Sequence, residues 1–136
     1  MKQIFTALLF MFLVVGFVTV GFTANAYNSI QEIKLDGDDA INKTTTLLLE
    51  FESVSVDSYR FQDSSYNAIY FEKSDKFKET IKKIIKSKES GDSMASYNRA
   101  YAHIQYHVTF KIIRFEGNSI VGDIIKITDS EKKEIK

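Results

Sequence analysis

The two histidines, His103 and His107, are the residues best suited to chemistry, because an imidazole can bind a metal or transfer a proton. They lie four positions apart. On a helix this spacing would place both rings on one face, as in a two-histidine metal site. On a strand their Cβ atoms would lie roughly 13 Å apart, too far for one ion. The alternation of apolar and polar residues over 101–112 favours a strand, so the spacing argues against a shared metal site.

Other catalytic and ligand-binding patterns are absent from the sequence. The 136 residues include no cysteine, which excludes disulfides, thiolate metal sites and cysteine nucleophiles. There is no glycine-rich phosphate loop, no Gly-x-Ser-x-Gly elbow and no His-Glu-x-x-His motif. A calcium loop starting at Asp36 fails, because Ala40 and Ile41 occupy its fifth and sixth positions. We therefore expect neither catalysis nor a bound metal or cofactor.

The polar face of the strand expected over 101–112 is the first candidate binding surface. Its side chains suit recognition of a protein partner: Tyr101, His103, Gln105 and His107. Tyrosine buries a large area at an interface for a small entropic cost and keeps a hydroxyl for hydrogen bonding. Tyrosine is equally common in strands that bind nothing, so partner binding by this strip is a hypothesis.

A lysine-rich helix expected over 75–88 is the second candidate surface. Six lysines within 13 residues would give it a cationic face that attracts polyanions or an anionic membrane surface. The anion-binding residues would be Lys78, Lys82, Lys83 and Lys86. No aromatic residue is interleaved on that face, so it offers no platform for stacking bases. The alternative is a solvated helix face, because lysine is a good helix former.

The charge balance limits the partners. The chain has 18 basic and 18 acidic residues. Residues 1–26 contain one charge, Lys2, so residues 27–136 hold 17 basic and 18 acidic residues. A dedicated binder of nucleic acid or another polyanion normally carries a basic excess. The balance therefore favours a protein partner and argues against nucleic acid.

The first 26 residues have the pattern of an export signal. Lys2 precedes an uncharged, mostly apolar run over residues 4–22. Ala24 and Ala26 then form the small-x-small ending that a signal peptidase requires. The run is also long enough to span a bilayer, which takes about 20 residues.

Two fates of this leader are open. Cleavage after Ala26 would make Tyr27 the first residue of the mature chain, whereas an uncleaved leader would anchor the protein in a membrane. Both fates place residues 27–136 outside the cytoplasm, in the periplasm or in a secreted form.

Composition and hydrophobic patterning divide the rest of the chain into three segments. Residues 27–43 predict a tether or short helix, residues 44–128 a single β-rich domain, and residues 129–136 a charged, frayed tail. Since 44% of all residues are hydrophobic, a packed core is feasible and wholesale disorder is excluded.

The first half of the domain reads as three strands. A long strand starts at Thr44, and its inward-facing parity reverses at Val54 and Val56, which indicates a β-bulge. Two shorter strands follow around residues 59–61 and 66–71.

A helix over 75–88 separates these strands from the last two. Ser74 or Asp75 would cap its first turn, and Gly91 would end it. Its apolar stripe consists of Phe77, Ile81, Ile84 and Ile85.

A long final hairpin completes the domain. The strand over 101–112 changes parity at Ile113, which predicts a second bulge, and the chain turns at Gly117. The closing strand spans 120–127, where Gly122 permits a bend or a close backbone approach.

This order of elements resembles the OB-fold, a small five-stranded Greek-key barrel. The resemblance covers about residues 44–128 and is carried by segments 68–77 and 106–127, not by a diagnostic motif. It implies a β-rich α+β barrel with one helix plugging its bottom, and a binding module whose family ligands are oligonucleotides or oligosaccharides. The chain departs from the nucleic-acid pattern because it has no basic, aromatic-rich face. The competing fold is an open antiparallel sheet with one packed helix, as in cystatin-like domains.

The sequence thus predicts an exported, non-catalytic module that binds a protein partner. A binder of polyanions or an anionic membrane surface through the lysine-rich helix is the alternative.

Overall fold

The structure, a computed structural model, describes residues 25–98 and 104–136. Within these ranges a short helix and a 3-10 turn, α2 (Ile30–Asp36) and η1 (Gly37–Ala40), precede the sheet. The strands are β1 (Thr44–Val54), β2 (Ser58–Gln62), β3 (Ala68–Glu72), β4 (Gln105–Glu116) and β5 (Ser119–Thr128). Between β3 and β4, a 3-10 turn and a helix follow one another, η2 (Asp75–Phe77) and α3 (Lys78–Asn98).

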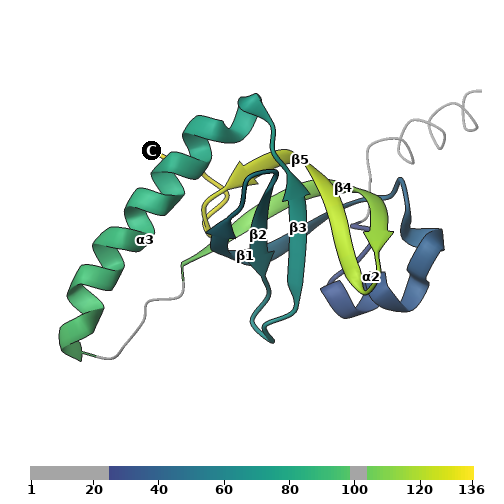
Figure 1. The fold of residues 1–136 in the computed structure, drawn as a ribbon, viewed down its shortest axis with the longest axis horizontal. Helices are drawn as coiled ribbons and strands as arrows, with labels where there is room; N and C mark the ends of the chain where they lie inside the picture. The colour runs from purple at the N-terminus through teal and green to yellow at the C-terminus, as the bar shows by residue number, and fades with distance from the viewer. Residues whose placement is uncertain (1–24, 99–103) are drawn as a thin grey trace, which may run out of the picture.

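The five strands close into a barrel in the order β1-β2-β3-β5-β4, and β4 returns to β1. Neighbouring strands are antiparallel except β3 and β5, which run parallel. The prediction of a β-rich domain is confirmed. The competing prediction of an open antiparallel sheet is wrong, because the sheet closes on itself. The two helices α2 and α3 lie at opposite ends of the barrel (Figure 1).

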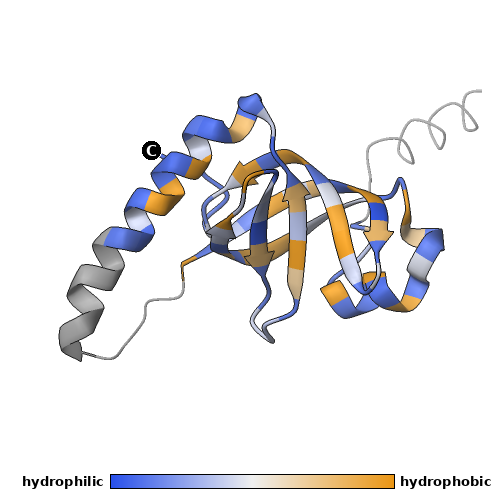
Figure 2. Ribbon diagram, viewed as in Figure 1, coloured by the Kyte–Doolittle hydropathy of each residue, from blue (hydrophilic) through white to orange (hydrophobic). Residues whose placement is uncertain are grey.

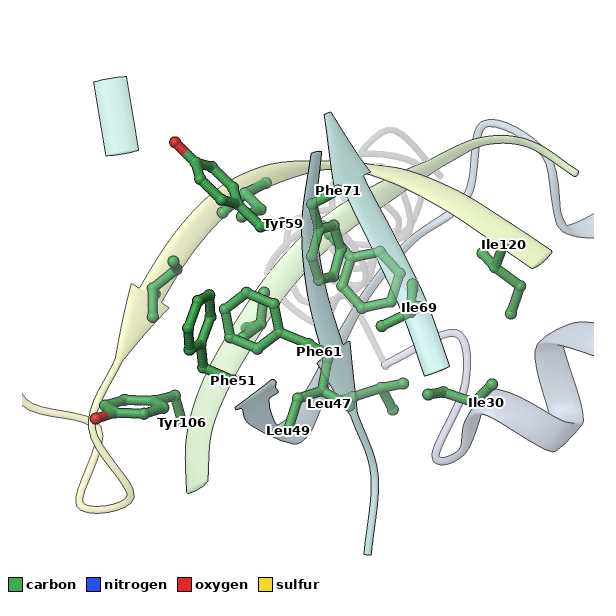
Figure 3. Packing of buried hydrophobic residues seen from close by; sticks show 14 of the residues in the cluster. Ile30, Leu47, Leu49, Phe51, Tyr59, Phe61, Ile69, Phe71, Tyr106 and Ile120 are labelled. Carbon is green, nitrogen blue, oxygen red and sulfur yellow. The ribbon is translucent and has the colours of Figure 1, made fainter. Parts of the chain in front are cut away.

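The barrel interior is built largely from alternate residues of β1 to β4, whereas β5 buries consecutive residues on either side of its bulge. Apolar and polar colours alternate along the strands in Figure 2. Along β4 the buried residues are Tyr106, Val108, Phe110 and Ile112. Four phenylalanine rings from four strands pack edge to face across the centre. Their successive centroids lie 5.4, 5.4 and 5.0 Å apart, in the order Phe51, Phe61, Phe71 and Phe110. Figure 3 labels the first three of these rings.

Both predicted bulges are present, and the first lies directly after Phe51, where the sequence pattern placed it. The register between β1 and β2 shifts between Phe51 and Ser53. Beyond it, Val54 and Val56 are 48% and 95% exposed, so the prediction that they continue the core face is wrong. The physical reason is that the strand ends at Val54, and the amide of Ser55 donates to the Ser58 carbonyl to close a turn.

The second bulge lies between Ile112 and Arg114, where β4 loses its register with β5. Gly122 of β5 permits the close approach expected of it. A Cβ added there would lie 3.0 Å from the Phe71 ring and 3.1 Å from the Phe110 ring. A larger residue at this position would force these two rings to shift by a few tenths of an ångström away from the β5 backbone.

Helix α3 packs its predicted stripe on the barrel. Phe77, Ile81 and Ile84 are buried, and Ile85 is partly buried against the same core. The predicted end at Gly91 is wrong, because the helix continues to Asn98. A glycine inside a helix costs about 1 kcal/mol but does not by itself break the hydrogen-bond ladder.

The segments flanking the barrel are structured too. Ile30 and Ile33 of α2 are fully buried, so residues 27–43 form a packed short helix instead of a tether. The fraying of residues 129–136 stays a prediction, but the tail does make contacts with the domain. The Asp129 carboxylate accepts hydrogen bonds from the amides of Glu131 and Lys133, and Ile135 packs against the core.

Candidate functional site

Of the four residues in the predicted partner-binding strip, the structure describes two. Gln105 and His107 are half-buried on the outer face of β4, where the alternation placed them. Tyr101 and His103 lie outside the described residues. His107 lies opposite Leu48 of β1, and its Nε2 is 3.2 Å from the carbonyl oxygen of Ser130.

His107 belongs to a groove on the outer face of three strands, which we call the β1–β4–β5 groove. Its volume is about 540 Å³. The sheet register places its central side chains in two rows: Leu48, His107 and Thr128, then Thr46, Thr109 and Lys126. The hydroxyls of Thr46 and Thr109 lie 2.7 Å apart and hydrogen-bond across β1 and β4. Asn25, Asn28 and Lys132 also line the groove.

The β1–β4–β5 groove has an unusual charge composition for a chain with equal numbers of acids and bases. Among the described residues that line it are two lysines and a histidine, and none is an aspartate or glutamate. The carboxylates of two residues next to groove residues in the chain accept hydrogen bonds from backbone amides. Glu32 accepts from the Asn28 amide, and Asp129 accepts from the amides of Glu131 and Lys133. The groove therefore offers ammonium, amide and hydroxyl donors to an anionic ligand.

Asn25 attaches the segment before α2 to the edge of β1. Its side-chain Oδ1 accepts from the Thr46 amide at 2.7 Å and from the Thr45 hydroxyl at 2.7 Å. Its Nδ2 donates to the Thr46 carbonyl at 2.8 Å and to the Tyr27 carbonyl at 2.9 Å. The side-chain amide thus pairs with β1 as a neighbouring strand would. The sequence pattern did not indicate this role, because Asn25 falls within the predicted leader, residues 1–26.

A second contact holds the same segment. The Tyr27 hydroxyl donates to Oδ2 of Asp36 at 2.6 Å, and Nζ of Lys43 lies 3.5 Å from that oxygen. The hydrogen bond from Tyr27, more than the charge of Lys43, holds the pKa of Asp36 below its usual range. A carboxyl with a lowered pKa stabilises the fold above its unfolded-state pKa of about 3.9. That contribution is lost as the pH falls through the folded-state pKa.

The lysine-rich helix is less available to anions than its sequence implied. Lys78, Lys82, Lys83 and Lys86 are all exposed. Nζ of Lys82 lies 2.8 Å from Oε1 of Glu79, and Nζ of Lys83 donates to the Ile135 carbonyl at 3.3 Å. Lys88 donates to two carbonyl oxygens of β1. Part of the cationic face is therefore engaged within the protein.

The charged residues on the outer faces of β2 and β3 form ion pairs with residues of β1 and β4. Arg60 forms an ion pair with Glu52 at 3.0 Å, and its guanidinium lies 5.7 Å from the centroid of the Tyr70 ring. Arg114 pairs with Glu72 and Glu116. This face presents no excess of positive charge to a polyanion.

The described residues were also compared with the requirements of a metal site and of a membrane-spanning helix. Within residues 25–98 and 104–136, no three His, Asp or Glu side chains are grouped so that they could hold a metal ion. In that same part of the chain, no helix is both long enough and apolar enough to cross a membrane.

Comparison with known proteins gives no relative. The chain matches no protein-family model, no curated protein and no solved structure.

Proposed function

We propose that this protein is an exported, non-catalytic binding module that holds an acidic segment of a partner protein in the β1–β4–β5 groove. The observation that carries the proposal is the charge of the groove. Lys126, Lys132 and His107 line it without any carboxylate among the described lining residues, in a chain with no net charge.

The chemistry of the groove suits a peptide better than a simple anion. Lys126 and Lys132 can pair with carboxylates, while the hydroxyl of Thr109 and the side-chain amide of Asn28 can bond to peptide groups. Leu48 is 39% exposed and offers an apolar contact. Complementary charge would speed the encounter and select acidic partners.

We also propose that the barrel is of the OB-fold type. The strand order β1-β2-β3-β5-β4, the parallel pairing of β3 with β5 and the helix between β3 and β4 support this assignment. Barrels of that type bind ligands on the face of strands 2 and 3, so the β1–β4–β5 groove would be a different surface of the same fold.

The second candidate function is binding of polyanions or an anionic membrane surface through Lys78, Lys82, Lys83 and Lys86. Exposure of all four side chains favours it. The ion pair of Lys82 and the hydrogen bond of Lys83 weigh against it, because binding an anion would compete with these contacts.

Titration of the exported protein with a short oligo-glutamate peptide tests the groove. We expect amide NMR shifts around His107, Thr109 and Lys126, and weaker binding as salt rises, because salt screens exposed charges beyond about 8 Å. Replacing Lys126 and Lys132 together by alanine should weaken binding about three- to tenfold, since each exposed ion pair contributes up to about 1 kcal/mol. Equal binding by this double variant would contradict the proposal.

Lys111→Ala is the matched control. Lys111 is exposed on β4 of the same sheet, and it does not line the groove. It should bind the peptide as the unaltered protein does.

Recovery of partners from an envelope extract separates the two candidate functions. Replacement of Lys82, Lys83 and Lys86 by glutamate should leave recovery unchanged if the groove is the site. Loss of recovery in that variant would favour the helix. Tyr101→Ala and Gln105→Ala test whether the strip extends the groove.

We expect the exported protein to retain Asn25, so that any cleavage falls before it and not after Ala26. The four hydrogen bonds of Asn25 support this expectation, because cleavage after Ala26 would remove them. Intact mass of the protein from its native host measures the first residue. A chain that begins at Tyr27 would contradict retention of Asn25, and a full-length cytosolic chain would contradict export.

Chains that begin at Asn25 and at Tyr27 provide the energetic comparison. The shorter chain should be less stable to urea by about 2–6 kcal/mol, since it lacks the four hydrogen bonds of Asn25 and each contributes roughly 0.5–1.5 kcal/mol net. Asn25→Ala in the longer chain should lose a similar amount. Asn28→Ala, an exposed neighbour, should lose little. Equal stability of the two chains would remove the energetic reason for retaining Asn25.

A further inference from the structure

A second hollow lies where the start of α3 meets the β1–β2 end of the barrel, and we call it the α3 cleft. Its volume is about 400 Å³, within the range of small-molecule sites. Apolar groups from the barrel and the helix line it: Val54, Tyr59, Ile81 and Ile85. None of these residues lines the β1–β4–β5 groove, so the two hollows are separate.

The Tyr59 hydroxyl is a polar group without a partner in this cleft. Tyr59 is only 5% exposed, and its hydroxyl points away from the phenylalanine rings of the core (Figure 3). Within the part of the chain that the structure describes, this hydroxyl forms no hydrogen bond. Burial, and to a smaller extent the charge of Asp75, raises the pKa of Tyr59, so the group is a neutral donor at physiological pH. The hydroxyl oxygen is not among the fully buried atoms, so in the free protein it can bond to water, and a ligand acceptor can take the place of that water.

Lysines dominate the rim of the cleft. Lys73, Lys78 and Lys82 line it, and Asp75 is the one carboxylate among the described lining residues. Lys82 is paired with Glu79. For Lys73 and Lys78, by contrast, no hydrogen bond or ion pair of Nζ is present within residues 25–98 and 104–136. These two ammonium groups can pair with an anion.

We propose that the α3 cleft binds a small amphipathic anion of the alkyl carboxylate class. The alkyl chain lies on Val54, Ile81 and Ile85, which removes apolar surface from water. The carboxylate accepts a hydrogen bond from the Tyr59 hydroxyl and pairs with Lys73 and Lys78. The combination of an apolar floor, a hydroxyl donor that has no protein partner and two ammonium groups that form no ion pair selects this ligand over a purely apolar or purely anionic one.

Titration of the exported protein with octanoate, followed by amide NMR, tests the proposal. We expect saturable shifts confined to the segments around Val54, Tyr59 and Ile81. Octanol has the chain without the charge and should bind at least tenfold more weakly, and acetate, which has the charge without the chain, should give no saturable shifts. If octanol bound with the same affinity as octanoate, the proposed role of the carboxylate would be wrong. If octanoate gave no saturable shifts, the α3 cleft would not be a binding site for this class of ligand.

Substitutions of the residues that line the α3 cleft test which of them contact the carboxylate. Tyr59→Phe keeps the ring in the core and should weaken octanoate binding about three- to tenfold. Lys73→Gln with Lys78→Gln should weaken it at least tenfold, and Lys111→Gln, elsewhere on the barrel, should not change it. Unchanged affinity in both the tyrosine variant and the double lysine variant would overturn the assignment.

Two further measurements separate the α3 cleft from the β1–β4–β5 groove and from a membrane surface. Replacing Lys126 and Lys132 by alanine should leave octanoate affinity unchanged, so failure of the groove proposal and failure of the cleft proposal are distinguishable. Vesicles of anionic phospholipid test a membrane surface as the source of the anion. If Lys73 and Lys78 are needed for vesicle binding while octanoate does not bind, the cleft is part of a membrane-binding surface and the proposal is wrong.

Discussion

Phe61→Ala should lower the free energy of unfolding by about 3–5 kcal/mol. Phe61 is fully buried at the centre of the barrel, and its ring centroid lies 5.4 Å from those of both Phe51 and Phe71. Truncation removes two edge-to-face contacts and leaves a cavity that the surrounding strands can fill only in part. Since small domains are stable by about 5–15 kcal/mol, this change would remove much of the total. Urea unfolding followed by far-ultraviolet circular dichroism measures the loss.

Two variants make the result specific to the core. Phe61→Leu keeps most of the apolar volume and should lose clearly less than Phe61→Ala. Tyr66→Ala removes an aromatic ring that is 70% exposed and should change stability by no more than about 0.5 kcal/mol. A loss after Phe61→Ala as small as that after Tyr66→Ala would show that the four rings do not form the core.

Individual strands, the helix and their buried faces could be predicted, because residues that are buried on one face recur at regular intervals in the sequence. The alternation from Tyr106 to Ile112 fixed both the strand and its inner face. The spacing of Phe77, Ile81 and Ile84 fixed the face of α3 that packs on the barrel. Gly122 signalled a close approach in the closing strand.

The pairing of distant strands and the exact ends of β1 and α3 could not be predicted from the pattern of neighbouring residues. The pairing of β3 with β5 joins Ile69 to Ile120 across 51 positions, and alternation does not reveal which strands are neighbours. Val54 and Val56 continue an apolar pattern across the end of β1, because two residues of alternation cannot distinguish a strand from the turn that follows it. The helix runs through Gly91 because a single glycine is a weak stop.

The candidate site was only partly predictable for the same reason. His107 was identified because it lies on the polar face of an evident strand. Thr46 and Lys126, its neighbours in the β1–β4–β5 groove, come from strands far away in the sequence and become adjacent only when the barrel closes. Asn25 acts through hydrogen bonds to the backbone of β1, and the sequence carries no pattern for such a contact.

Ile84→Ala is expected to cost about 2–5 kcal/mol of unfolding free energy. Ile84 is 1% exposed and lies in the middle of the α3 stripe that contacts the barrel. Alanine has a higher helix propensity than isoleucine, so a loss of stability measures packing between helix and barrel and not the helix itself. Urea unfolding of the variant gives the value, and retained helical circular dichroism before the transition would show that α3 still forms.

Lys83→Ala is the control for Ile84→Ala, because Lys83 is exposed on the preceding residue of the same helix. It should change stability by no more than about 0.5 kcal/mol. If Ile84→Ala were equally mild, α3 would not be docked on the barrel. The α3 cleft would then have no floor, because Ile81 and Ile85, on the same stripe, line it only when the helix is docked. The stability of this one variant therefore tests both the packing of the helix and the existence of the proposed carboxylate site.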